Sequence, residues 1–169
     1  MPQCLFLLRG FDFRTRRGHY GVMARARVKL SVVVPLFNEA GNVAPLHERL
    51  LSVLRGGEPF EIIFVDDGSQ DDTFERARAL SPLTLIRFGE NYGQTAALAA
   101  GIQAAKGDIV VTMDGDLEND PRDIPLLLAK LYEGFDVVSG WRRDRWRGQF
   151  TRRVPSIFAN KVISWITGV

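Results

Sequence analysis

The chain is organised around the stretch Ile109-Val110-Val111-Thr112-Met113-Asp114-Gly115-Asp116-Leu117-Glu118, in which an apolar run of strand length passes directly into three acidic residues. On an extended backbone alternate side chains point the same way, so Asp114, Asp116 and Glu118 are expected to converge. Converging carboxylates repel one another unless a cation lies between them. Their oxygens suit Mg²⁺ or Mn²⁺, which leave coordination positions for substrate phosphates. A solvated acidic turn is the alternative, because short motifs of this kind occur by chance.

From Leu30 to Ser139, apolar runs alternate with helical patterns. Strands are predicted at 30–34, 60–65, 83–88, 109–113 and 136–139. Helices are predicted from a cap at Asn38 or Asn42 to about Leu54, from a cap at Asp71 or Asp72 to Leu80, over 95–106, and from Pro121 through Leu131. Strands that are apolar throughout and short connections indicate an α/β fold, with a mostly parallel sheet covered by helices on both faces. Ligands of such sheets bind outside the carboxyl ends of the strands, and the polar loops after the strands fall at those ends.

Size and composition set broad limits. With 169 residues and 46% apolar content, the chain is expected to form one domain with one core. The net charge of +2 argues neither for nor against nucleic acid, and no nucleic acid is expected as a partner. The single cysteine, Cys4, excludes an internal disulfide and a cysteine metal cluster. No apolar run approaches the roughly 20 residues of a membrane-spanning helix.

Both ends of the chain are richer in arginine than the middle. Residues 1–27 show no sustained period and are predicted to be a disordered tail or a non-native start, with translation beginning at Met23 as one hypothesis. The domain is expected to cover residues 28–169 and to close with a basic amphipathic helix over 150–168. Basic residues interleaved with Trp and Phe after Gly140 favour an interfacial segment at a membrane surface. The alternative is a phosphate-binding loop followed by an ordinary core helix.

A second acidic motif, Asp66-Asp67-Gly68-Ser69, follows the strand at 60–65. Carboxylates only accept hydrogen bonds, so this motif suits ribose hydroxyls and the N–H edge of a nucleobase. Helix capping by Ser69 or Asp71 is expected to account for part of it. In the loop after the first strand, Glu39 offers a further acceptor and Phe37 an aromatic face.

Three segments together resemble the signature segments of the family 2 glycosyltransferases with the GT-A fold. They are Val32-Val33-Val34-Pro35-Leu36-Phe37-Asn38-Glu39, Val65-Asp66-Asp67-Gly68-Ser69 and Met113-Asp114-Gly115-Asp116-Leu117-Glu118. The resemblance runs from about Leu30 to the C-terminus and is strongest to the polyprenyl-phosphate subgroup, the dolichol-phosphate mannosyltransferase type. It implies a Rossmann-like GT-A domain that is truncated at its C-terminus, because members continue with an acceptor-side segment and many then add transmembrane helices.

The resemblance also implies residue roles. Nucleotide-sugar binding would fall to Pro35, Phe37, Glu39, Asp66, Asp67, Asp114, Gly115 and Asp116. Metal binding, of Mg²⁺ or Mn²⁺, would fall to Asp114, Asp116 and Glu118, although members of the dolichol type commonly have Gln at position 118. The acceptor phosphate would be held by Arg142, Arg152 and Ser156, and Arg142 would act with Asp114 and Asp116 in catalysis. The loop between Arg142 and Arg152 is shorter than in archaeal-type enzymes.

The expected function is therefore inverting transfer of a sugar from a UDP- or GDP-sugar to a polyprenyl phosphate, at the cytoplasmic face of a membrane. A phosphate acceptor is already an anion and needs no general base, which fits two histidines, His19 and His47, that lie away from the strand ends. His47 is expected on the solvent face of its helix. Alternatives are a glycan acceptor, a catalytically incomplete nucleotide-sugar-binding fragment, and a phosphatase of the haloacid dehalogenase type. In that phosphatase Asp114 would be the nucleophile and Asp116 the general acid, but Asp66 and Asp67 would have no role.

Overall fold

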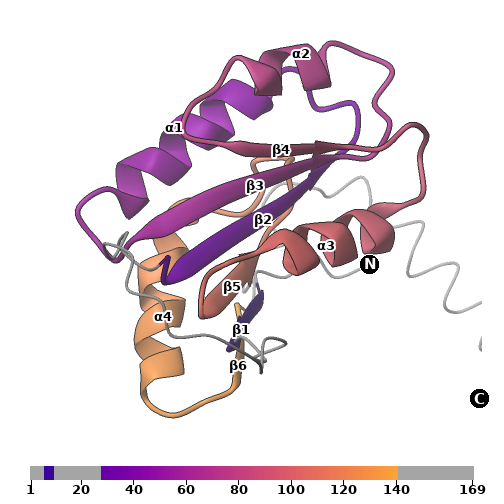
Figure 1. Ribbon diagram of the computed structural model, residues 1–169. Coiled ribbons are helices and arrows are strands. Elements are labelled where there is room, and N and C mark those ends of the chain that lie inside the picture. The colour runs from indigo at the N-terminus through magenta and orange to yellow at the C-terminus, as the bar shows by residue number, and fades with distance from the viewer. Residues whose placement is uncertain (1–5, 10–27, 141–169) are drawn as a thin grey trace, which may run out of the picture.

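The sheet has six strands in the order β4-β3-β2-β5-β1-β6. The computed structural model describes residues 6–9 and 28–140. Its strands are β1 (Phe6–Arg9), β2 (Leu30–Leu36), β3 (Phe60–Asp66), β4 (Thr84–Arg87), β5 (Ile109–Thr112) and β6 (Val137–Ser139). Its helices are α1 (Val43–Leu54), α2 (Thr73–Arg78), α3 (Gln94–Ala104), the 3₁₀-helix η1 (Pro121–Asp123) and α4 (Ile124–Tyr132) (Figure 1).

Strands β4, β3, β2 and β5 are parallel. Every residue of β2 is buried, because helices cover both of its faces. In the register, Leu36 at the end of β2 pairs with Asp66, and Asp66 pairs with Arg87 of β4. On the other side of β2, Val33 pairs with Thr112 at the end of β5. The loops that follow β2, β3 and β5 therefore leave the same edge of the sheet and are neighbours.

The two faces of the sheet carry separate apolar clusters. Val32, Val34 and Leu36 of β2 face one cluster, which also contains apolar residues of α1, α2 and α4. Val33 faces the other cluster, which contains Ala97 of α3. Helices α1 and α2 lie on one side of the sheet and α3 on the other (Figure 1). The predicted α/β architecture, a mostly parallel sheet with helices on both faces, is confirmed.

Strand β1 corrects the expectation that residues 1–27 lie wholly outside the fold. Phe6–Arg9 pairs antiparallel with β5 on one side and with β6 on the other. Four residues are too few to show a period in the sequence, and the pairing partners come from far along the chain. The rest of the predicted tail and the predicted helix at 150–168 lie outside the described residues.

His47 in α1 does not lie on the solvent face of the helix, contrary to the expectation from the sequence. The side chain is buried, with 4% of its surface exposed, and its Nε2 lies 3.0 Å from the carbonyl oxygen of Pro82. Its ring meets the ring of Phe64 edge-on. Positions 43, 46, 47 and 50 follow the helical period, so His47 shares the apolar stripe of the helix. The hydrogen bond between His47 Nε2 and the Pro82 carbonyl oxygen explains why a polar residue occupies this buried position.

Candidate functional site

A pocket of about 310 Å³ opens at the carboxyl ends of β2, β3 and β5, a volume within the range of small-ligand sites. Its lining comes from four segments of the chain: Pro35, Leu36, Phe37 and Glu39; Asp67; Asn91, Gly93 and Gln94; Asp114, Gly115 and Asp116. All the residues predicted to bind a nucleotide sugar are in this set except Asp66. The fold thus brings together acidic motifs that are about 50 residues apart in the sequence.

The loop after β2 is fixed to the loop after β3 by hydrogen bonds between them. The backbone N–H of Asn38 donates to Ser69 Oγ at 3.0 Å, and the N–H of Gln70 donates to Asn38 Oδ1 at 2.9 Å. The N–H of Glu39 donates to Thr73 Oγ1 at 2.8 Å. Asn38 has a positive φ of 55°, a conformation that Asn tolerates. These contacts hold the wall of the pocket that carries Phe37 and Glu39.

Asp66 does not line the pocket and is fully buried. Its Oδ1 accepts a hydrogen bond from the N–H of Ser69 at 3.2 Å, so the carboxylate closes the turn that follows β3. Its Oδ2 has no hydrogen-bond partner among the described residues and lies 3.5 Å from Arg87 Nε. The guanidinium of Arg87 lies over the ring of Phe74, 4.2 Å from its centroid. Asp66 therefore shapes the turn.

Asp67 is also buried, although it lines the pocket. Its Oδ1 accepts from the N–H of Tyr92 at 2.8 Å, and its Oδ2 accepts from the N–H of Gly93 at 2.9 Å. The second acidic residue of the motif therefore ties the turn before α3 to the end of β3. Gly68 makes this approach possible, because a Cβ on it would lie 2.4 Å from the carbonyl carbon of Glu90.

The segment after β5 differs from the expected extended backbone. The strand ends at Thr112, residues 115–117 form a bend, and Leu117 has a positive φ of 61°. The N–H of Glu118 donates to Asp116 Oδ1 at 2.9 Å, and the Glu118 side chain is exposed. Alternation therefore does not aim the three carboxylates at one point. Within residues 6–9 and 28–140, no three His, Cys, Asp or Glu side chains form a group that could hold a metal ion.

Gly115 allows Asp114 and Asp116 to reach the pocket. It is buried, and a Cβ on it would lie 2.5 Å from Leu36 Cδ2 and 3.3 Å from the carbonyl oxygen of Pro35. The motif after β5 is therefore pressed against the end of β2, with one lining carboxylate on each side of the glycine.

Four lining residues, Leu36, Asn91, Gly93 and Gln94, were not predicted to bind the nucleotide sugar, and the last three are near one another in the chain. Asn91 and Gly93 belong to the turn between β4 and α3, which carries no acidic or basic motif, and Gln94 is the first residue of α3. The only sequence signal for this turn was its position after a predicted parallel strand, because such turns open at the ligand-binding edge of the sheet. Gln94 reaches across to Asp114, where its Nε2 donates to Oδ1 at 2.6 Å.

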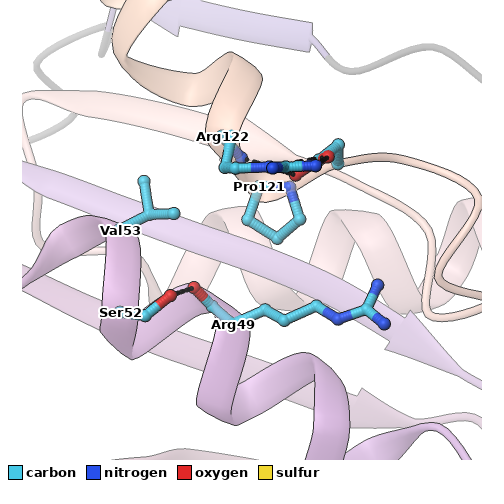
Figure 2. A pocket seen from close by; sticks show the side chains of 6 residues that line it. Arg49, Ser52, Val53, Pro121 and Arg122 are labelled. Carbon is cyan, nitrogen blue, oxygen red and sulfur yellow. Dashed lines mark hydrogen bonds and ion pairs between the residues drawn. The ribbon is translucent and has the colours of Figure 1, made fainter.

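A second pocket, of about 260 Å³, lies between α1 and η1 (Figure 2). It is lined by Arg49, Ser52, Val53, Asp120, Pro121 and Arg122. Hydrogen bonds from Arg122 lower the pKa of Asp120 to about 2, so the charge of Arg122 is largely offset. In Figure 2, the ring of Pro121 lies between Arg122 and Arg49. None of the predicted nucleotide-sugar residues lines this pocket.

Arg142, Arg152 and Ser156, the residues predicted to hold an acceptor phosphate, lie outside the described residues. No helix in the described ranges has the length and apolar character needed to cross a bilayer.

A family profile and two known proteins are similar to this chain. The profile of the family described as "Glycosyl transferase family 2" matches residues 31–166. A dodecaprenyl-phosphate galacturonate synthase of Rhizobium johnstonii is 44% identical over 149 residues, which are 84% of this chain and 44% of that protein. An undecaprenyl-phosphate 4-deoxy-4-formamido-L-arabinose transferase of Pseudomonas savastanoi pv. phaseolicola is 39% identical over 146 residues, 83% of this chain and 43% of that protein. The chain thus spans less than half the length of these relatives.

Solved structures share the fold. Glucosyl-3-phosphoglycerate synthase from Mycobacterium tuberculosis, in complex with Mn²⁺, UDP and phosphoglyceric acid, superposes with a TM-score of 0.53 and 32% identity. The match covers 63% of this chain and 40% of that chain. The same enzyme with Mg²⁺ and UDP gives the same TM-score, identity and coverage.

Proposed function

This chain belongs to glycosyl transferase family 2, and on that premise we propose that the pocket after β2, β3 and β5 binds the nucleoside diphosphate of a nucleotide-sugar donor. One observation carries the proposal: Phe37, Asp67 and Asp116, from three separate loops, line a single pocket at the ligand-binding edge of the sheet. Glu39 supplies acceptors for the ribose, and Phe37, with 43% of its surface exposed, offers a face for the base.

The donor set fits a divalent cation. Asp114 and Asp116 present carboxylate oxygens to the pocket, and such oxygens suit Mg²⁺ or Mn²⁺. We assign the ion to these two residues, with Glu118 as an outer contributor because its side chain is exposed. A bound ion would offset the charge of the departing diphosphate. The synthase structures that contain Mn²⁺ or Mg²⁺ with UDP support the use of a divalent cation.

For the acceptor we propose a polyprenyl phosphate, on the support of the two relatives named for prenyl-phosphate transfer. A phosphate oxygen of the acceptor attacks the anomeric carbon, and the bond to the diphosphate oxygen breaks with its electron pair. The configuration inverts and the nucleoside diphosphate leaves. An anionic acceptor needs no general base, which fits the position of His47, a buried residue that does not line the pocket.

Arg142, Arg152 and Ser156 are proposed to hold the acceptor phosphate, with Arg142 next to the donor. The basic segment at 150–168 is proposed to lie on the cytoplasmic face of a membrane, where each basic side chain would contribute about 1 kcal/mol on an anionic leaflet. A glycan acceptor and a nucleotide-sugar-binding role without turnover are the competing functions. The family match contradicts the phosphatase alternative.

Calorimetry tests the donor pocket. UDP and GDP are titrated into the parent chain, Asp116→Ala and Asp136→Ala, each with and without Mg²⁺. Asp136 is an exposed residue that does not line the pocket, so it is the matched control. We expect metal-dependent binding of one nucleotide by the parent and by Asp136→Ala, and its loss in Asp116→Ala. Binding without metal, or an unaffected Asp116→Ala, would refute the site.

The membrane assignment has its own experiment. The parent chain is expected to float with vesicles that contain anionic lipid. The double variant Arg152→Glu, Arg153→Glu should not float with the vesicles, because each substitution replaces an attractive charge with a repulsive one. Equal flotation of both chains would remove the interfacial role of this segment.

A further inference from the structure

Gln94 crosses the pocket to meet Asp114. It is the first residue of α3, and its side-chain amide donates to Asp114 Oδ1 at 2.6 Å, although the two residues are 20 positions apart. Both line the pocket. Gln94 lies outside the three motifs that carry the family resemblance, so neither the sequence nor the comparisons give it a role.

The backbone of Gln94 is held from both sides. Before it, Gly93 and Tyr92 donate their N–H groups to the two carboxylate oxygens of Asp67. After it, α3 lies against the sheet so closely that a Cβ on Gly101 would stand 2.3 Å from Val33 Cγ1. The start of the helix therefore has a fixed position relative to β2 and β3, and the Gln94 side chain begins from a fixed point.

We propose that Gln94 is a positioning residue that orients the Asp114 carboxylate for the cation and the diphosphate, an inference that rests on the proposed function. The neutral amide suits this task. An amide donor fixes the direction of one carboxylate oxygen and adds no positive charge, so the carboxylate keeps its full attraction for a divalent ion. A lysine or arginine in the same place would compete with that ion. Groups that orient metal ligands in this way typically change metal affinity when removed.

Asp67 contributes indirectly to the orientation of Asp114, through its hydrogen bonds to the turn before α3. Asp67 fixes Gly93, Gly93 precedes Gln94, and Gln94 contacts Asp114. The acidic residue at the end of β3 thereby influences the acidic residue after β5, although β2 lies between the two strands. Asp67 acts here through the backbone of the turn.

The test measures Mn²⁺ affinity directly. Free Mn²⁺ is followed by electron paramagnetic resonance during titration of the chain at saturating UDP, for the parent, Gln94→Ala and Gln103→Ala. Gln103 is an exposed glutamine near the other end of the same helix and is absent from the pocket lining, so it controls for the loss of a glutamine from α3. We expect Gln94→Ala to weaken Mn²⁺ binding about 10-fold and Gln103→Ala to leave it unchanged. Both variants should keep the melting temperature of the parent, because both side chains are exposed.

The outcomes distinguish failure of the proposed role of Gln94 from failure of the proposed donor pocket. A parent chain that binds no nucleotide with metal refutes the donor pocket itself. A parent that binds, with Gln94→Ala equal to Gln103→Ala, overturns the role of Gln94 alone. A drop in Mn²⁺ affinity for Gln94→Ala, with unchanged melting, supports orientation of Asp114. An equal drop in both variants attributes the effect to α3 as a whole and also overturns the role.

Discussion

Asp66 at the end of β3 and Arg87 at the end of β4 form an ion pair of unequal exposure, with 3.5 Å between Oδ2 and Nε. The Asp66 side chain is fully buried, and that of Arg87 is half exposed. A buried carboxylate is costly unless a cation or hydrogen bonds compensate it. Arg87 supplies that cation, and its guanidinium lies over the ring of Phe74. The pair therefore stabilises the turn after β3, although neither Asp66 nor Arg87 lines the pocket.

Replacing Arg87 with Gln should lower the free energy of unfolding by about 1 to 2 kcal/mol. Removal of one partner from a fully buried pair costs more, but water reaches Arg87 and screens part of the interaction. Urea denaturation followed by circular dichroism measures the change. Arg78→Gln is the control, because its pair with Glu75 is exposed on both sides and should contribute little. Equal stability of the two variants would contradict a supporting role for Arg87.

Three glycines form a graded series for substitution by alanine. Gly41 has open space and no positive φ, Gly56 has a positive φ of 90° in open space, and Gly68 combines a φ of 70° with a blocked Cβ position. We expect little change for Gly41→Ala, a loss of about 1 kcal/mol for Gly56→Ala, and about 2 to 4 kcal/mol for Gly68→Ala. Urea denaturation ranks the three. A Gly68→Ala variant no less stable than Gly56→Ala would show that the turn at Glu90 can move aside.

The glycine variants are also expected to differ in nucleotide affinity. Alanine at position 68 pushes on the backbone of Glu90 and Asn91, and Asn91 lines the pocket. Nucleotide affinity should therefore fall in Gly68→Ala and stay unchanged in Gly56→Ala, when both are measured at a temperature at which each is folded.

Asp120 near the second pocket gives a prediction for pH. Hydrogen bonds from Arg122 hold the pKa of Asp120 at about 2, against an ordinary value of 3.8. A lowered pKa in the folded chain stabilises it above about pH 4, and this contribution is lost as the pH falls from about 4 toward 2. The nuclear magnetic resonance signal of the Asp120 carboxyl carbon should therefore show a largely ionised group at pH 3. In Arg122→Ala the midpoint should return toward 3.8.

Arg49→Ala is the matched control, since Arg49 lines the same pocket and contributes less to the lowered pKa (Figure 2). It should shift the midpoint less than Arg122→Ala does. A titration of the parent with its midpoint near 4 would show that the ion pair between Asp120 and Arg122 does not persist in solution.

The sequence predicted the features of the fold that depend on composition and chain direction. Apolar runs of strand length with short helical connections require parallel strands, so Asp66 and Asp116 had to leave the same edge of the sheet. The resemblance to family 2 glycosyltransferases is likewise confirmed. His47 shows where reasoning from polarity fails, because its spacing from Val43 and Leu50 placed it on the apolar stripe although its side chain is polar.

Features that depend on contacts between distant segments could not be predicted. The bend after β5 is set by Gly115 against Leu36, which no pattern within 109–118 reveals. Strand β1 is stabilised by β5 and β6, which lie 100 residues or more further along the chain. The engagement of Asp67 with the turn before α3, and of Gln94 with Asp114, likewise requires the assembled loops.

Asp116 and Glu118 should differ sharply as metal ligands, in contrast to the three equal carboxylates expected on an extended strand. Asp116 lines the pocket, whereas the Glu118 side chain is exposed and its N–H donates to Asp116 Oδ1. Glu118→Gln removes a charge and keeps this backbone hydrogen bond, so Mn²⁺ affinity at saturating UDP should fall no more than about 3-fold, as for the loss of a screened charge. Asp116→Asn removes a ligand charge inside the pocket and should lower the affinity at least about 100-fold, as for the loss of a bound carboxylate at a divalent site. The titration used for Gln94 measures both variants. Equal losses would mean that the bend at 115–117 straightens when the ion binds and brings Glu118 into the pocket.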